Sequence, residues 1–364
     1  GLYGWLKSRQ FVLAVRLWTA IGAGMRVSIA LGVAAAEELS FEEIVSTVNS
    51  AGTTWVAEVP SKFGSPEDVR GLCGTILKGD ERYVETLAEK EEQEMADEDI
   101  PAEFDVRTAW PACANVSGHV RDQSSCGSCW AFGSTEAFND RRCIATGDTT
   151  FMSPEDTVAN CGFVQCFSMG CNGGQPGAAW SWFTKAGVVT GGDFDDKGKG
   201  DTCAPYSLAP CAHHVPPTAK YPACPSSEYP TPSIGSKCTE GSYAKDYHSD
   251  KQKAASSYSL SGVAKIQADI AKYGTVTAAF TVYSDFPTYK SGVYKHTSGS
   301  ALGGHAIKIL GWGTEAGQDY WLVMNSWNEA WGDKGLFKIA RGTNECGIES
   351  QVSAGTVTAE TIVV

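Results

Sequence analysis

The stretch QSSCGSCWAF, residues 123–132, decides how the rest of the chain is interpreted. Apolar residues recur at helical spacing from Trp130 to Cys143, which predicts a helix there. Cys129 would then lie in the first helical turn, where unpaired backbone N–H groups and the helix dipole favour a thiolate. Taken alone, Cys126 and Cys129 are also typical of a dithiol redox pair, half of a zinc site, or a structural cysteine beside a reactive one.

Two later motifs supply partners for this thiol. His305 stands in the sequence GGHA, between two glycines and an apolar run that predicts a strand. Asn325 ends another apolar run and begins the sequence NSW, in which Trp327 follows. We expect the Asn325 amide oxygen to accept the imidazole N–H and fix its tautomer, with Trp327 shielding that bond from water. A thiol, an imidazole and an amide are the parts of an activated sulfur nucleophile.

Gln123, six residues before Cys129, would complete the site. Its side-chain N–H₂ and the backbone N–H of Cys129 could form an oxyanion hole, in which one donor lowers the barrier by about 3–4 kcal/mol. Either Cys129 or His305 alone is more often a buried core residue. Three motifs in this order make that interpretation much less favoured.

Together the motifs resemble those of the papain family of cysteine proteases, and the resemblance extends from Trp55 to Ser350. It implies an α+β, papain-like fold of two lobes with the substrate cleft between them. Residues 101–250 would form a mainly helical lobe, and residues 251–364 an antiparallel β-barrel lobe. The later position of His305 and Asn325 calls for an insertion between the two halves, which makes the chain similar to the cathepsin B group of the family.

Composition limits the classes of protein. The chain of 364 residues, with 42% apolar and 20% charged residues, is globular and long enough for two lobes and a pro-segment. Thirteen cysteines argue for an oxidising secretory route. Residues 80–99 hold ten acidic and two basic residues, which favours a solvated, pH-dependent linker over a cation site. No basic stripe suggests a nucleic-acid partner.

The N-terminal 100 residues are expected to be removed from the working protein. Residues 1–36 are predicted to be a signal region, since Arg16 and Arg26 break the apolar runs below the length of a membrane span. Residues 37–100 resemble the cathepsin B propeptide with an acidic linker, and the Cys-Gly segment at residues 72–75 would lie across the cleft. We expect cleavage in the linker before Ile100 or Pro101.

The insertion, at about residues 203–243, is rich in Pro, Gly, Ser and Tyr. It resembles the occluding loop of cathepsin B, in which paired histidines, here His213 and His214, close the primed end of the cleft and bind the substrate's C-terminal carboxylate. By the same resemblance, Asp122 would pair with His213 and hold the loop down. The family's second clamp, an Arg–Asp pair, has no match here, with Lys220 and Ala330 near those positions. Metal binding is the alternative for the two histidines, but no third ligand is evident.

The resemblance also assigns the remaining site residues. The backbone of Gly173 and Gly174 would bind extended substrate beside the nucleophile. Gln351, where cathepsin B has a glutamate, would lie at the base of the second specificity pocket and favour Phe-Arg over Arg-Arg reporters. Carried over from the family, the disulfides are Cys113–Cys143, Cys126–Cys171, Cys161–Cys166, Cys203–Cys238 and Cys211–Cys224. Cys129 would be the nucleophile, with Cys73 and Cys346 free.

The sequence thus predicts a lysosomal, vacuolar or extracellular cysteine protease, made as a zymogen, that removes C-terminal dipeptides and also cleaves internally. It implies no cofactor and no metal. Its partners would be peptide and protein substrates, its own propeptide as inhibitor and cystatin-type inhibitors, and the protein would be a monomer. Two other classes stay open at this point, a catalytically silent binding protein and a thiol–disulfide oxidoreductase.

Overall fold

The computed structural model describes residues 38–60, 65–213 and 215–359. The predicted signal region, His214 and the last five residues therefore lie outside the described residues. Among the described helices, none combines the length and the apolar character that crossing a bilayer requires.

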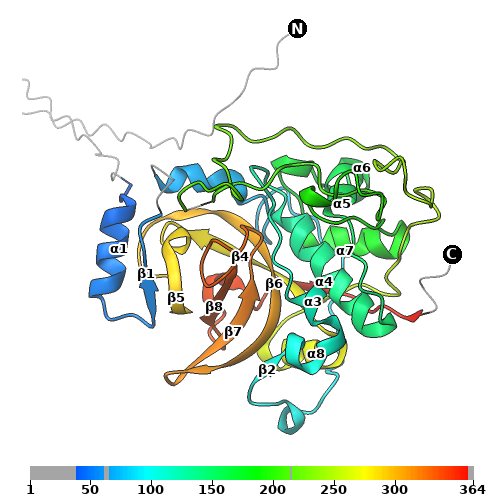
Figure 1. Ribbon diagram of the computed structural model, residues 1–364. Helices are drawn as coiled ribbons and strands as arrows, with labels where there is room; N and C mark the ends of the chain where they lie inside the picture. The colour runs from blue at the N-terminus through cyan, green and yellow to red at the C-terminus, as the bar shows by residue number, and fades with distance from the viewer. Residues whose placement is uncertain (1–37, 61–64, 214, 360–364) are drawn as a thin grey trace, which may run out of the picture. The chain divides into compact units, whose positions relative to one another are not determined.

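Helices dominate the first half of the body and strands dominate the second (Figure 1). The helices are α1 (Phe41–Ser50), α2 (Val106–Ala109), α3 (Ala114–Ser117), α4 (Cys129–Thr146), α5 (Pro154–Asn160), α6 (Phe163–Cys166), α7 (Pro176–Lys185) and α8 (Val263–Tyr273). The strands are β1 (Trp55–Ala57), β2 (Phe104–Asp105), β3 (Tyr258–Leu260), β4 (Val276–Tyr283), β5 (Tyr289–Tyr294), β6 (Ala301–Glu315), β7 (Gln318–Met324), β8 (Leu336–Ala340) and β9 (Val352–Ala354).

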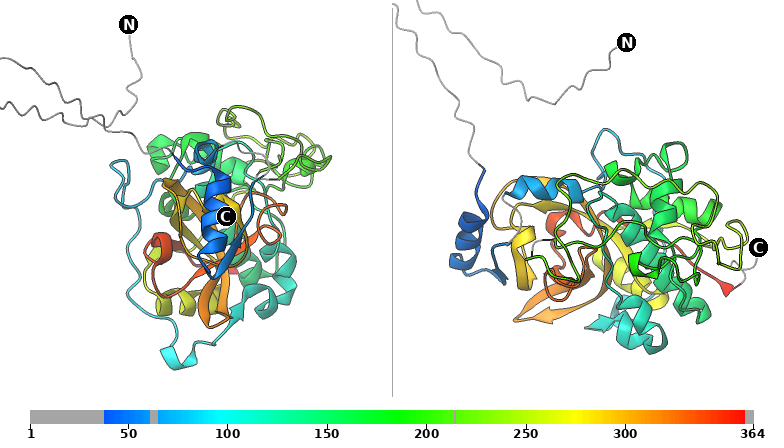
Figure 2. Two further views of the ribbon diagram at one scale, coloured as in Figure 1. Left: turned by 90° about the vertical axis from the view of Figure 1, so that its left-hand side faces the viewer. Right: turned by 45° about the horizontal axis from the view of Figure 1, so that its top comes forward.

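These strands form one sheet in the order β1-β5-β8-β7-β6-β4-β9-β3, with β2 paired to β6. Most neighbours are antiparallel, as predicted, but β5 and β8 run parallel, so the sheet is mixed. The chain leaves β5, forms the β6–β7 hairpin and returns to pair β8 with β5, and this path was not visible in the apolar pattern. Helices α3–α7 lie on one side of the sheet and α1 lies on the other (Figure 2).

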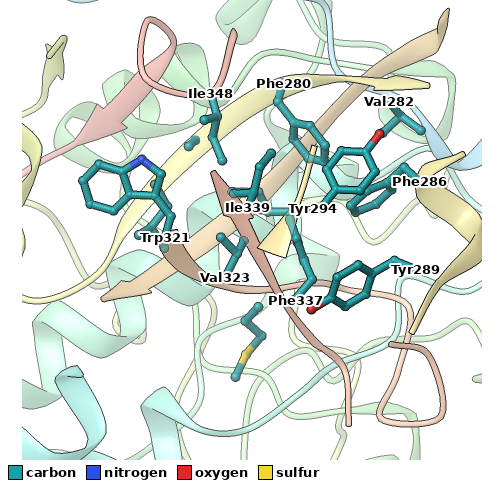
Figure 3. Packing of buried hydrophobic residues seen from close by; sticks show 14 of the residues in the cluster. Phe280, Val282, Phe286, Tyr289, Tyr294, Trp321, Val323, Phe337, Ile339 and Ile348 are labelled. Carbon is teal, nitrogen blue, oxygen red and sulfur yellow. The ribbon is translucent and has the colours of Figure 1, made fainter. Parts of the chain in front are cut away.

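Each lobe has its own apolar core. Aromatic side chains fill the β lobe, where Phe286 packs at 4.9 Å from Phe337 and at 5.3 Å from Tyr294, measured between ring centroids (Figure 3). The helical lobe buries Trp180 between α4 and α7, 6.2 Å from Phe138. The two apolar clusters are separate, although each includes residues from both halves of the chain, such as Val106 in the first and Ala254 in the second.

The N-terminal segment, residues 38–99, packs on this body instead of standing apart from it. α1 begins with a capping box, in which Ser40 and Glu43 bind each other's backbone N–H. Strand β1 pairs antiparallel with β5 and so extends the sheet at its edge. Trp55 of β1 is buried and donates its indole N–H to the Lys295 carbonyl at 2.9 Å. The sequence had not predicted that the segment joins the sheet.

The insertion is held by cross-links and not by helices or strands. The Cys203–Cys238 and Cys211–Cys224 disulfides lie within it, and the structure joins the other expected cysteines as Cys113–Cys143, Cys126–Cys171 and Cys161–Cys166. Cys73, Cys129 and Cys346 are free. Covalent closure suits a segment with so little apolar core, because it restricts the unfolded chain.

Candidate active site

Cys129 is the first residue of α4 and is fully buried. Ser128 is the N-cap residue, so the thiol lies in the first turn, where the helix dipole favours negative charge. Burial acts to raise the pKa of the thiol, but the charge of the nearby His305 and the contact with the Thr75 hydroxyl outweigh it, and the pKa is lowered. The environment therefore favours a thiolate at this position.

His305 lies on β6 and faces the thiol from the β lobe. Its Nε2 is 2.8 Å from Oδ1 of Asn325, the residue that directly follows β7. The Trp327 ring covers this pair, with its centroid 4.8 Å from that of the imidazole, and all three side chains are buried. The predicted shielding geometry is therefore present, and the Asn325 contact leaves Nδ1 of His305 as the nitrogen available to sulfur.

Close packing and a buried ionic cluster set the two lobes against each other. A Cβ on Gly133 of α4 would lie only 3.2 Å from the Ile307 carbonyl of β6, so a side chain at this position would press the two elements apart by a few tenths of an ångström. Lys308, three residues after His305, places its Nζ 3.0 Å from Asp140 and 3.7 Å from Glu136, both on α4. Burial raises the pKa of Glu136 to about 7 against the opposing charge of Lys308. This cluster holds β6, which carries His305, against α4, which carries Cys129.

Gln123 lies beside the nucleophile and is fully buried. Its Nε2 donates to the Cys126 carbonyl at 2.8 Å and to the Leu72 carbonyl of the N-terminal segment at 3.0 Å. Its Oε1 accepts from the Ser326 hydroxyl, which holds the amide in this orientation. The Leu72 carbonyl of the N-terminal segment therefore already accepts a hydrogen bond from the Gln123 side chain, which we expected to face an oxyanion.

Residues 74–76 of the N-terminal segment cross the cleft as an extended strand. Gly174 donates its N–H to the Gly74 carbonyl and accepts from the N–H of Ile76, both at 2.9 Å. On the opposite wall, Thr75 donates to the Gly304 carbonyl at 2.9 Å. The Thr75 hydroxyl lies 3.2 Å from the Cys129 sulfur. The segment therefore lies directly on the nucleophile.

Glycines make this close approach possible. A Cβ on Gly74 would lie 1.8 Å from the Gly127 carbonyl oxygen, and one on Gly173 would lie 2.8 Å from the Gly74 carbonyl oxygen. Gly173 also adopts φ +112°, which a residue with a side chain rarely adopts. The predicted peptide-binding position of Gly173 and Gly174 is therefore occupied by the chain's own backbone.

Gln351 lies further along the same cleft. Its Oε1 accepts the N–H of Lys78 at 2.6 Å, so the segment leaves the cleft beside the predicted second pocket. At the opposite end, the segment passes the insertion, since a Cβ on Gly71 would lie 2.2 Å from the Glu228 carboxylate. The segment thus runs from the insertion towards Gln351.

Asp122 holds the insertion down, as expected, through a buried contact with His213. Oδ1 of Asp122 lies 2.8 Å from Nε2 of His213, and Oδ2 accepts from Asn328 and from the Cys211 N–H. The His213 side chain is only 1% exposed. His213 also lines a cavity with Gly71 and Leu72 of the N-terminal segment, so the binding of a substrate carboxylate by His213 stays a prediction.

A second clamp is present where the sequence showed none. Nζ of Lys220 lies 2.5 Å from the Glu329 carboxylate, one residue before the alanine that stands at the family position. Both side chains are more than half exposed, so the pair contributes about 0–1 kcal/mol. Glu329 lies one residue before the expected position. A search of the residues around both family positions for any pair of opposite charges would have found Lys220 and Glu329.

In the structure, disulfides take up cysteines that the two alternative chemistries, a dithiol redox pair and a metal site, would need as free thiols. Cys126 is bound to Cys171, so it forms no dithiol pair with Cys129. Cys211 and Cys224 lie near the His213 ring, but their sulfurs are joined to each other and offer no thiolate to a metal ion.

Comparisons with known proteins agree with this arrangement. A family model described as papain family cysteine protease matches residues 100–356. The cathepsin B-like cysteine proteinase 4 of Caenorhabditis elegans is 44% identical over 86% of this chain and 91% of its own length. The cathepsin B-like cysteine proteinase of Schistosoma japonicum is 43% identical over 87% of this chain and 90% of its own length. The chain therefore belongs to the papain family of cysteine proteases.

Solved structures narrow this class. The proCathepsin B S9 structure from Trypanosoma congolense superposes with a TM-score of 0.70 at 30% identity, over 86% of this chain and 96% of that chain. A digestive procathepsin L2 proteinase from Tenebrio molitor follows with a TM-score of 0.61 at 26% identity, over 87% and 89%. Within the family, the protein is a cathepsin B-like cysteine peptidase with a papain-like α+β fold.

Proposed function

We propose that the chain is the zymogen of a peptidase that removes C-terminal dipeptides and also cleaves internally. The observation that carries the proposal is a peptide strand, residues 74–76, bound by backbone on both walls of the cleft and touching Cys129. A site that binds main chain in this way accepts many sequences, which suits a protease.

In the proposed mechanism, the Cys129 thiolate attacks the scissile carbonyl carbon, and its oxygen becomes an oxyanion. Gln123, now bound to the Leu72 carbonyl, turns its N–H to that oxygen. His305 gives the proton on Nδ1 to the leaving amine, while Asn325 holds Nε2 and fixes the ring. Water then attacks the thioester, His305 accepts its proton, and the acid product leaves as sulfur regains its charge.

We propose that residues 37–100 are an inhibitory propeptide whose described part is bound in reverse. Substrate would run from the pocket at Gln351 towards the insertion, whereas this segment runs from the insertion to Gln351. Thr75 accordingly pairs with Gly174 in a parallel bridge. A reversed strand fills the cleft but offers its carbonyl carbon to Cys129 in the wrong orientation, so it blocks without being cleaved there.

The insertion would limit substrates at the primed end. Asp122 anchors it through His213, and we propose that His213 and His214, by their resemblance to the family, meet the terminal carboxylate of the substrate. A protonated imidazole donates a strong hydrogen bond to a carboxylate below about pH 6–7. Five disulfides support folding in an oxidising, secretory compartment, with a lysosome, vacuole or extracellular space as the destination. Cystatin-type inhibitors and a monomeric state remain part of this proposal.

The test compares two peptides that differ only at their C-termini, one free and one amidated. The full chain is activated with acid, and mass spectrometry follows the products. We expect dipeptides to leave the free peptide in sequence and the amidated peptide to react at least ten-fold more slowly. Equal rates with internal cuts in both would refute the dipeptidase assignment while leaving cysteine peptidase activity intact.

A further inference from the structure

Beyond the cleft, the N-terminal segment reaches a second surface of the body. Its residues 88–94 lie along strand β3 and helix α8. We refer to this region as the β3–α8 surface, which comprises Tyr258, Ser259, Ser261, Lys265, Asp269, Lys272 and Tyr273. The acidic linker, expected to be solvated, is therefore bound here in part.

Backbone pairing provides the first element of recognition. Ser259 donates its N–H to the Ala88 carbonyl at 3.0 Å and accepts from the Lys90 N–H at 2.9 Å. β3 is the last strand in the order of the sheet, so its outer edge carries unpaired groups when the linker is absent. An exposed edge of this kind accepts an extended peptide as an added strand.

A cage for one ammonium group provides the second element. Nζ of Lys90 lies 4.4 Å from the ring centroid of Tyr258, 4.9 Å from that of Tyr273 and 3.2 Å from the Asp269 carboxylate. Asp269 is buried and also binds Arg141 at 2.6 Å. Two aromatic faces and a buried carboxylate are a selective combination for a cation. The cage belongs to the body, where Arg141 and the Tyr258 hydroxyl both bind the Asp269 carboxylate.

Acidic side chains on both sides of Lys90 meet basic or hydroxyl groups. Glu94 forms an ion pair with Lys272 and accepts the Tyr273 hydroxyl at 3.1 Å. On the other side, Glu89 binds the Ser261 hydroxyl and lies 3.8 Å from Lys265. The β3–α8 surface therefore matches an extended peptide in which a lysine lies between glutamates.

From this geometry we infer that the β3–α8 surface is a peptide-binding exosite of the processed enzyme, and that the released linker binds back to it through Lys90 and its flanking glutamates. The inference rests on the proposed removal of residues 37–100. The exosite lies beyond Gln351, at the end of the cleft opposite the insertion, and residues 83–89 line the path between them. A released segment would thus hold the enzyme at two linked sites, which raises its affinity above that of either one.

The test uses the peptide of residues 86–96, TLAEKEEQEMA, with a fluorescent label. Processed enzyme is first titrated with an epoxide inhibitor that blocks Cys129, so that the cleft chemistry is measured separately. Fluorescence anisotropy then follows peptide binding. We expect saturable binding, with a dissociation constant at least ten-fold higher for a peptide carrying Lys90→Ala and several-fold higher for the Lys272→Ala enzyme.

The control enzyme carries Lys185→Ala, which removes an exposed lysine at the C-terminal end of α7 that is not one of the residues of the β3–α8 surface. It should bind the peptide like the unmodified enzyme. Equal binding of the unmodified and Lys90→Ala peptides, or no binding at all, would overturn the exosite. If the enzyme bound the peptide but neither hydrolysed reporters nor took up the epoxide, the proposed function would fail and the exosite would stand.

A second measurement does not depend on processing. In the full chain with Cys129→Ala, hydrogen exchange at the Lys90 amide should be protected, because that amide is bound to Ser259. Adding Lys90→Ala should raise exchange across residues 88–94 at least ten-fold while residues 74–76 stay protected. Unchanged protection of residues 88–94 would contradict recognition by the cage.

Discussion

The N-terminal segment is bound in two regions by different means. Across the cleft, residues 74–76 are bound through main-chain groups and through glycines that permit contact. On the β3–α8 surface, residues 88–94 are bound mostly through charged side chains. Main-chain binding is indifferent to sequence, as a general protease cleft must be, whereas side-chain binding selects one pattern. The contrast shows which region can be changed without altering what the cleft accepts.

The largest expected effect separates chemistry from binding in the cleft. Cys129→Ala removes the nucleophile but leaves the groups of Gly174 and Gly304 that bind the segment. Hydrolysis of a Phe-Arg reporter after acid treatment should fall by about 10⁴-fold or more, since the other groups cannot replace the nucleophile. Both regions of the segment should stay protected from exchange. Residual activity within ten-fold of the parent would contradict the role of Cys129.

The next effect breaks the cleft contact alone. Gly74→Ala would place a methyl group 1.8 Å from the Gly127 carbonyl oxygen, so the strand must move away from Cys129. We expect the unprocessed protein to label with an epoxide about 100-fold faster than the parent. The control is Gly241→Ala, where a Cβ meets no atom within 4 Å. If Gly74→Ala labelled no faster than this control, the strand would not be what blocks the nucleophile.

A smaller effect concerns Gln351, whose side chain accepts the N–H of Lys78. Gln351 is neutral, and we expect the processed enzyme to prefer Phe-Arg over Arg-Arg reporters. Gln351→Glu should raise kcat/KM for Arg-Arg about ten-fold relative to Phe-Arg, because a carboxylate pairs with a guanidinium. Because glutamine and glutamate have the same shape, comparison with the parent enzyme isolates the effect of the charge. An unchanged ratio would mean that the second pocket does not include this residue.

The smallest effect is the pH response of the linker. Burial acts to raise the pKa of Glu94, but hydrogen bonds from Lys272 and Lys90 outweigh it and lower the pKa to about 2, against 4.5 for a free glutamate. A lowered pKa gives stability that is present above pH 4.5 and is lost as pH falls towards 2. The protection factors of residues 88–94, which compare the measured exchange rate with the intrinsic rate at the same pH, should therefore change little between pH 7 and 5. Release near pH 5 would show that Glu94 does not control docking.

Much of the architecture was evident from the sequence because local signals agreed with the final packing. The helix at Cys129, the strand at His305 and the apolar run before Asn325 all follow from the spacing of apolar residues. The family assignment is confirmed by the matching relatives. The five disulfide pairs came from the resemblance and have the same partners in the structure.

The features that were missed depend on contacts between distant residues. Residues 88–94 bind Lys265 and Lys272, which lie about 180 positions later in the chain. The acidic residues taken by themselves therefore predicted a solvated linker. The burial of His213 follows from the fold of the insertion over Asp122. The Lys220–Glu329 pair joins residues 109 positions apart. No local pattern carries information of this kind, and only the folded chain brings these charges together.

The two ion pairs that hold the insertion on the body differ in their exposure to solvent. Ionic strength should therefore weaken one pair more than the other. Salt screens the exposed Lys220–Glu329 pair strongly and the buried Asp122–His213 pair little. Added salt should then free one margin of the insertion while the other acts as a hinge. The proportion of internal cuts to terminal dipeptides would rise with salt, which makes the product pattern a gauge of the medium in which the enzyme works.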